Sequence, residues 1–186
     1  MKLSVILGSP RLASSSEKLA KAAAQSLVGP DDSVEYFRLN DLHYRGCQGC
    51  YACKTKTEFC VIKDDLTRVL SAVTVSDYVI LTSPIYIGEI SSQLKGFVDR
   101  TFSWYKPVYV NAPEPSRLKP GKKLLFIISQ GMPDPAGYQR NIEAYLNYFS
   151  SHGFKSAHYI APIGTDDLET TQAKLLTEVV SLAKNL

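Results

Sequence analysis

Short apolar runs alternate along the chain with longer amphipathic stretches. Two runs, at residues 78–83 and 123–129, are continuous, which is typical of strands buried on both faces of a sheet. Shorter β-type runs lie at residues 2–7, 34–39 and 156–161. Helical patterns lie at residues 14–28, 65–72, 91–104, 138–151 and 168–184.

This alternation predicts an α/β domain in which a parallel sheet carries helices on both faces. Right-handed crossovers favour a three-layer α/β/α sandwich whose five parallel strands have the order 2-1-3-4-5. No internal repeat divides the sequence, so we expect residues 1–186 to form a single domain. In this order ligands bind outside the carboxyl ends of strands 1 and 3, which directs attention to the loops after Leu7 and Ser83.

Composition narrows the class of protein. Hydrophobic residues make up 45% of the chain and charged residues 21%, as in a globular protein. The net charge of +3 includes no basic run, so we expect no nucleic-acid partner and no membrane surface. No apolar stretch approaches the roughly 20 residues of a membrane span. Residues 1–8 are too short for a signal peptide and are interpreted as a strand, so we expect a cytoplasmic protein.

Hydroxyl groups and one arginine gather between the first strand and the first helix. The residues are Ser9, Arg11, Ser14, Ser15 and Ser16. Unpaired amides and the helix dipole attract anions to a helix start, and an arginine adds a charge-assisted hydrogen bond. The loop therefore predicts a phosphate site.

The residue types in this loop discriminate among phosphate ligands. The loop lacks the glycine pattern of dinucleotide loops and the Gly-Lys-Ser/Thr of nucleoside triphosphatases. It also lacks the cysteine of a phosphatase and the acidic residues of a phosphorylated receiver domain. A terminal phosphomonoester, as on FMN, fits the hydroxyls. The alternative is that the serines only cap the helix and that Arg11 is an ordinary surface residue.

An apolar and aromatic stretch, unusual for a solvated loop, follows the third strand. Pro84 and Gly88 bracket Ile85, Tyr86 and Ile87. These side chains indicate contact with a flat apolar ligand, and amides turned by the proline and glycine would bond the pyrimidine edge of a flavin. The alternative is that the side chains pack on a neighbouring helix or subunit.

The fourth strand ends at the same predicted edge of the sheet. Its last residues, Ser129, Gln130 and Gly131, carry polar groups that would reach the edge of a bound ring. By itself this segment supports the site only weakly, because polar residues are common at strand ends.

All four cysteines fall in a loop that we place at about residues 43–62. A secreted disulfide framework would spread them along the chain. The spacings resemble a ferredoxin-type run for one [4Fe–4S] cluster, without its terminal proline: Cys47, Cys50, Cys53 and Cys60. Zinc sites more often have two separated pairs. A cluster, free or reversibly oxidised thiols, and zinc remain the alternatives.

Three stretches together resemble the NAD(P)H-dependent FMN reductase group of flavodoxin-like proteins. They are Gly8-Ser9-Pro10-Arg11 with the following serines, Ser83-Pro84-Ile85-Tyr86-Ile87-Gly88, and Gln93-Leu94-Lys95-Gly96-Phe97-Val98-Asp99-Arg100. The resemblance covers nearly the whole chain and implies a flavodoxin-like fold. It implies that the hydroxyl-rich loop holds the FMN phosphate, that residues 84–88 line the isoalloxazine, and that residues 129–131 lie nearby. Relatives often have Asn-Thr where this chain has Ser15-Ser16.

The cysteine run is similar to that of the iron–sulfur flavoproteins, a branch of the same group. This similarity implies electron transfer between FMN and a cluster. Three hypotheses follow: an FMN-dependent oxidoreductase reduced by NAD(P)H or by a small electron-transfer protein, an iron–sulfur flavoprotein that carries electrons, and a thiol-based redox sensor. Flavin sites often borrow residues from a second subunit, so we expect a homodimer or homotetramer, with the aromatic helix at residues 138–149 as a contact.

Other polar residues receive structural interpretations. His43, His152 and His158 lack metal-ligand spacing, and Asp64 and Asp65 precede a helix that acidic residues would cap. We assign no general acid or base, because the reactive atom of a flavoprotein belongs to its cofactor.

Overall fold

A computed structural model of the protein describes residues 1–132, 134–162 and 168–186. Within these residues the main sheet has five parallel strands: β1 (Lys2–Leu7), β2 (Ser33–Arg38), β3 (Tyr78–Tyr86), β5 (Lys122–Gln130) and β6 (Phe154–Pro162). Their spatial order is β2-β1-β3-β5-β6. Counting these five strands alone reproduces the predicted order 2-1-3-4-5, so the predicted fold is confirmed.

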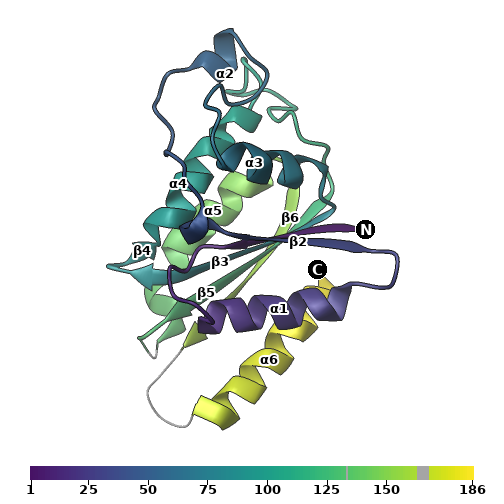
Figure 1. Ribbon diagram of the computed structural model, residues 1–186, viewed down its shortest axis with the longest axis vertical. Coiled ribbons are helices and arrows are strands. Elements are labelled where there is room, and N and C mark those ends of the chain that lie inside the picture. The colour runs from purple at the N-terminus through teal and green to yellow at the C-terminus, as the bar shows by residue number, and fades with distance from the viewer. Residues whose placement is uncertain (133, 163–167) are drawn as a thin grey trace.

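Helices cover both faces of the sheet (Figure 1). One face carries α1 (Ser15–Leu27) and α6 (Leu168–Asn185), and the other carries α3 (Leu66–Val75), α4 (Ser92–Arg100) and α5 (Gln139–Ser150). These bounds agree with the predicted helices to within a few residues. The helix predicted at residues 91–104 ends at Arg100 and continues as a 3₁₀-helix at Thr101–Trp104. Two further 3₁₀-helices lie at Leu39–Asp41 and Pro135–Tyr138.

Alternate side chains of each central strand enter two separate cores. In β5, Leu125 and Ile127 pack with α1 and α6, whereas Leu124, Phe126 and Ile128 pack with α3, α4 and α5. Burying one such side chain contributes about 1.5–3 kcal/mol. Because both faces are covered, these strands need apolar residues at every position, which explains the continuous apolar runs.

The segment after Ser83 differs from the predicted loop. The strand continues to Tyr86, turns at Ile87 and Gly88, and returns as β4 (Glu89–Ile90), antiparallel to β3. Ile87 and Gly88 have φ angles of 49° and 82°, and a two-residue type I′ hairpin turn requires positive φ at both central residues. The expectation of a loop was wrong because a β-branched residue at the first turn position conceals this turn from local propensity.

The cysteine segment contains a short helix that the sequence did not indicate, α2 (Ala52–Thr55). It lies at the end of the molecule beyond α3 and α4 (Figure 1). No helix among the described residues combines the length and apolarity needed to cross a membrane.

Candidate functional site

The loop after β1 lies directly against β3 and α4. The Gly8 amide donates to the Thr82 carbonyl at 3.0 Å. A Cβ atom on Gly8 would lie 2.5 Å from that carbonyl oxygen and 2.8 Å from the Leu94 Cβ. Only glycine therefore fits where the chain leaves the sheet, and this close approach fixes where the following hydroxyls lie.

The structure brings the five predicted phosphate residues together at the start of α1. Ser14 caps the helix by accepting from the Glu17 amide at 3.3 Å, and its Oγ lies 3.3 Å from that of Ser16. Ser9 and Ser16 are buried, Ser15 is half-buried, and Arg11 is exposed. The helix start thus combines amides, hydroxyls and a cation. The alternative interpretation, that the serines cap the helix, holds for Ser14.

Glu17 and Arg38 are two charged residues of this site that sequence reasoning missed. Their side chains form an ion pair, Lys21 approaches Glu17 at 2.8 Å, and Arg38 Nη1 also donates to the Arg11 carbonyl at 3.2 Å. Burial raises the pKa of Glu17, but hydrogen bonds and charge attraction from Lys21 and Arg38 bring it below its ordinary value. The Ser-x-x-Glu spacing from Ser14 to Glu17 is the signal that a capping-box search would have found.

The hairpin after β3 presents its apolar residues to solvent. Pro84 and Ile85 are half-buried, Tyr86 is exposed, and Ile87 at the tip is fully exposed. Gly88 lies beside α5, where Asn141 Nδ2 donates to its carbonyl at 2.9 Å. Within this chain, therefore, Tyr86 and Ile87 do not pack on a neighbouring helix.

One buried serine joins the two loops. The Ser91 Oγ donates to the Gly8 carbonyl at 2.6 Å, and the Ser91 amide donates to the Ser83 Oγ at 2.8 Å. The same Oγ caps α4 by accepting from the Leu94 amide at 3.2 Å. The loops after β1 and β3 consequently hold one fixed geometry. Sequence reasoning missed Ser91, whose long-range partners leave no local signal.

The third predicted segment lies at the same edge. Ser129 pairs in register with Pro84. The side-chain Nε2 of Gln130 donates to the carbonyls of Met132 at 2.9 Å and Asp134 at 2.7 Å. The Gln130 Oε1 is buried and has no partner among the described residues. Gly131 is exposed.

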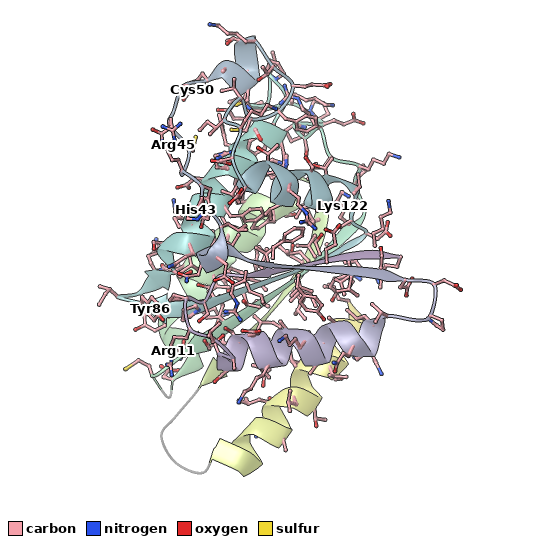
Figure 2. The ribbon with its side chains drawn as sticks, in the orientation of Figure 1. Arg11, His43, Arg45, Cys50, Tyr86 and Lys122 are labelled. Atoms are coloured by element: carbon pink, nitrogen blue, oxygen red, sulfur yellow. The ribbon has the colours of Figure 1, made fainter. Side chains whose placement is uncertain are left out.

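Exposed apolar side chains lie at the carboxyl ends of β1, β3 and β5 and in the turns that follow them. They are Leu12, Tyr86, Ile87 and Met132. Figure 2 places Arg11 and Tyr86 at this end of the sheet, with Cys50 far from both. The edge therefore combines an anion-attracting helix start with an apolar rim.

The four cysteines line one cavity. All are free thiols: Cys47 and Cys50 are exposed, Cys60 is half-buried and Cys53 is buried. The cavity measures about 630 Å³ and is also lined by side chains of α4 and α5 and by Glu89 of β4. It therefore lies between the thiols and the hairpin. Among the described residues, no group of three or more His, Cys, Asp or Glu side chains is arranged to hold a single metal ion.

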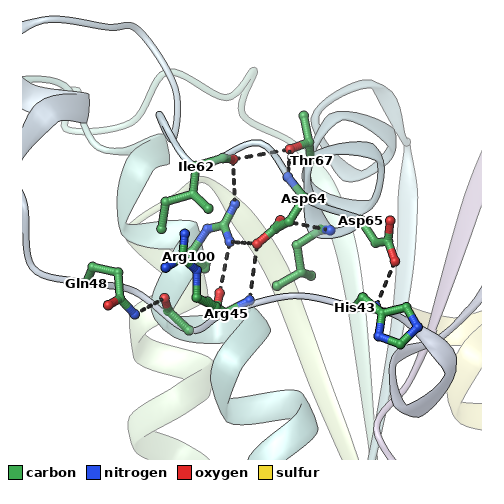
Figure 3. Close-up of polar contacts among 10 residues, drawn as sticks. His43, Arg45, Gln48, Ile62, Asp64, Asp65, Thr67 and Arg100 are labelled. Atoms are coloured by element: carbon green, nitrogen blue, oxygen red, sulfur yellow. Dashed lines mark hydrogen bonds and ion pairs between the residues drawn. The ribbon is translucent and has the colours of Figure 1, made fainter.

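Arg100 fixes both flanks of the cysteine segment (Figure 3). Its Nη1 donates to the Arg45 carbonyl at 2.9 Å and to Asp64 Oδ2 at 2.8 Å, and its Nη2 donates to the Ile62 carbonyl at 3.1 Å. Burial lowers the pKa of the Arg100 guanidinium, but Asp64 and then Cys60 raise it above its ordinary value. Of the two acidic residues predicted to cap α3, Asp64 accepts from the Leu66 amide at 3.2 Å, whereas Asp65, the N-cap residue, makes no side-chain cap hydrogen bond.

Two further cations hold the segment near Cys53. Lys54 Nζ donates to the carbonyls of Phe102 at 2.7 Å and Tyr105 at 2.8 Å, and Arg117 Nη2 donates to the Cys53 carbonyl at 3.2 Å. Burial lowers the pKa of Lys54, and the charge of Arg117 adds to this effect, whereas Cys53 opposes it. The Cys53 end of the segment is therefore held by two cationic side chains.

The fold and this edge define the class of the protein. Residues 1–184 match the family described as having a Flavodoxin-like fold, and the chain belongs to that family.

The chain is also similar to proteins with more specific names. It is 32% identical to an iron-sulfur flavoprotein of Archaeoglobus fulgidus over 144 residues, 76% of this chain and 62% of that protein's length. It is 29% identical to an iron-sulfur flavoprotein of Methanocaldococcus jannaschii over 203 aligned residues, 99% of this chain and all of that protein. The structure of an FMN-dependent NADH-azoreductase of Bacillus anthracis in complex with FMN has a TM-score of 0.71 at 17% identity, covering 99% of this chain and 98% of that one. This last likeness concerns the fold.

Proposed function

We propose that the chain binds FMN at the carboxyl edge of its sheet and acts as an oxidoreductase. It transfers electrons or hydride between NAD(P)H, or a reduced electron carrier, and an acceptor. The observation that carries this proposal is the meeting of an anion-attracting helix start with a rim of exposed apolar side chains. The names of the relatives support it.

The residues at the edge fit the two halves of FMN. Arg11 and the amides and hydroxyls at the start of α1 would hold the phosphate, with Ser9, Ser15 and Ser16 nearest. Residues 84–88 and 129–131 would line the isoalloxazine. The buried Gln130 Oε1, which lacks a partner among the described residues, fits an acceptor for a ring N–H group.

When bound, FMN supplies hydride and one-electron chemistry at its ring. The chain's own residues bind and orient the ring. Ser91 keeps the loops after β1 and β3 in one fixed geometry, and the hairpin amides would stabilise negative charge on the pyrimidine edge.

The test is a flavin titration of protein purified without air. We expect Arg11→Ala to weaken FMN binding at least tenfold. This corresponds to about 1.4 kcal/mol of binding free energy, the loss expected when a charge-assisted hydrogen bond is removed. Riboflavin, which lacks the phosphate, should bind both proteins equally. The control is Lys18→Ala, which removes one positive charge from an exposed position on α1. This variant should bind FMN with the wild-type affinity. Absence of flavin absorbance and of FMN affinity in the wild-type protein would contradict the proposal.

A second candidate function is electron carriage through FMN and a [4Fe–4S] cluster. The observation that favours it is the single cavity lined by all four thiols, with Lys54 and Arg100 beside them. Anionic thiolates and cations of this kind fit a cluster that carries negative charge. The cavity extends from the cysteines to Glu89 of β4 and would therefore lead from the cluster toward the proposed flavin edge.

Iron and sulfide content of the anaerobic protein tests this candidate. About four irons and four sulfides per chain are expected for one cluster, and Cys50→Ser should abolish them while FMN remains bound. One zinc per chain would support the zinc alternative. Flavin without metal would leave a reductase whose thiols act in another way, with the redox sensor as the next hypothesis.

We also propose a cytoplasmic homodimer or homotetramer. Exposed apolar side chains on the cysteine segment and on the loop at residues 106–117 support an oligomer: Tyr51, Val108 and Val110. The aromatic residues of α5, by contrast, are largely used within the chain, since Phe149 is buried and Tyr148 bonds to Thr101. Light scattering of the purified protein measures the subunit number.

A further inference from the structure

Two polar groups beside Cys60 are buried without partners. The Arg100 Nε and the Ser103 Oγ form no hydrogen bond within the described residues, and their residues are only 1% and 2% exposed. A buried polar group without a partner costs about 1–3 kcal/mol, and more when it is charged. Two such groups three positions apart, at the junction of α4 and its 3₁₀ extension, leave two donors without an oxygen or nitrogen acceptor among the described residues.

Both groups lie where two cavities meet. Arg100, Ser103 and Cys60 line the 630 Å³ cavity that holds the thiols, and they also line a second cavity of about 300 Å³ against α3. Cys60 is the one cysteine that lines both of these cavities. The two donors therefore lie beside one particular cysteine of the four.

Of the three guanidinium nitrogens of Arg100, Nε is the one without a partner among the described residues. Nη1 and Nη2 are occupied by Asp64 and by the carbonyls of Arg45 and Ile62, which hold the plane of the guanidinium in place (Figure 3). The main chain at Ser103 is also held, because its carbonyl accepts from Arg117 Nη1 at 2.9 Å. Both donors are thus positioned in advance, independently of any ligand.

The acceptor that fits is anionic sulfur. The Cys60 sulfur lies close enough to contribute, after Asp64, to the raised pKa of the Arg100 guanidinium, and no carboxylate except Asp64 bonds to this guanidinium in the described structure. Charged donors strongly prefer charged acceptors. Sulfurs of an iron–sulfur cluster accept hydrogen bonds, and these bonds set its reduction potential.

We propose that Arg100 Nε and Ser103 Oγ donate hydrogen bonds to sulfur on the Cys60 side of the [4Fe–4S] cluster and raise its reduction potential. The inference rests on the second candidate function above and assigns these two residues a tuning role within it. The bonds stabilise the more negative, reduced state, so their loss lowers the potential.

The test uses the iron-loaded protein and measures the cluster potential by redox titration followed by electron paramagnetic resonance. Ser103→Ala should retain full iron content yet shift the electron-transfer equilibrium of the cluster about tenfold toward the oxidised state, or about 59 mV. Ser103→Thr, which restores the hydroxyl, should restore the potential. Arg100→Lys keeps the charge, lacks the Nε donor, and should shift the potential in the same direction.

The control is Ser71→Ala. Ser71 lines the second cavity, but its hydroxyl already donates to the Thr67 carbonyl at 2.8 Å, so the potential should not change. Iron-replete Ser103→Ala with the wild-type potential overturns the assignment, even if Arg100→Lys fails to hold a cluster. A wild-type protein that takes up no iron overturns the cluster function itself, and that result is distinguished by the iron assay alone.

Discussion

The carboxyl edge of the sheet and the cysteine segment are built in different ways. At the edge, short contacts between adjacent elements position the loops: Gly8 lies against β3, and the buried Ser91 bonds to the Gly8 carbonyl and to the Ser83 hydroxyl. The cysteine segment includes only a four-residue helix, and charged side chains hold it: Arg100 and Arg117 from outside the segment, and Lys54 of α2, which bonds outward to the Phe102 carbonyl. The edge should therefore tolerate most side-chain changes, whereas the cysteine segment should depend on a few charged contacts.

The largest effect is expected at the edge, from Gly8→Ala. The added Cβ would approach a carbonyl oxygen to 2.5 Å and displace the loop from β3, so we expect a loss of more than about 4 kcal/mol in unfolding free energy or a failure to fold. Urea denaturation measures this loss. Gly29→Ala, where the new Cβ meets its nearest atom at 3.7 Å, is the control and should change little. A stable Gly8→Ala protein would contradict the view that backbone contact fixes this edge.

Asp64→Ala tests the dependence of the cysteine segment on charge. It leaves the buried Arg100 guanidinium without its carboxylate, which costs about 3 kcal/mol. We expect faster hydrogen exchange in residues 45–62 and loss of iron, with FMN affinity retained. Glu35→Ala breaks the exposed Glu35–Arg68 pair and should cost less than about 1 kcal/mol. If Asp64→Ala weakens FMN binding as well as speeding hydrogen exchange in residues 45–62, the two regions are not independent.

A pH series examines the packing behind the cysteine segment. His152 is fully buried against Trp104, Tyr105 and Tyr148, and burial, with a smaller effect from the charge of Lys54, lowers its pKa to about 3. Between pH 6.5 and about 3 the unfolded chain binds a proton at this ring and the native chain does not. The unfolding free energy should therefore fall as the pH falls, by at most about 1.4 kcal/mol per pH unit from this group.

His152→Gln should make that pH dependence shallower, whereas His43→Gln, at an exposed ring, should leave it unchanged. Denaturation curves at several pH values between 4 and 8 provide the comparison. Identical slopes for wild-type and His152→Gln proteins would mean that this ring titrates normally.

The smallest effect has the opposite sign. Ile87 has a left-handed backbone and is fully exposed, so it is strained without gaining burial. Ile87→Asn should raise the unfolding free energy by about 1 kcal/mol, because asparagine tolerates this conformation. FMN binding should become several-fold weaker if the hairpin contacts the ring. Unchanged FMN affinity would remove Ile87 from the flavin site.

The sequence predicts the sheet and the position of its functional edge because both depend on local patterns. Burial on two faces produces the apolar runs at β3 and β5, and the switch-point rule then places the loops after β1 and β3 together. The hairpin was missed because isoleucine is unfavourable at a turn position with positive φ, so Ile87 gives no turn signal. Ser91 and the Arg100–Asp64 pair were missed because their partners are distant in sequence, and no spacing records such contacts.

The attachment of Arg100 to both Arg45 and Ile62 has a consequence for assembly. By joining the two ends of the cysteine segment, it closes a short loop on the surface of an already complete domain. The loss of chain entropy needed to bring the thiols together therefore occurs largely when the domain folds. We therefore expect the segment to form a small cooperative unit of its own, which opens and closes while the sheet stays folded.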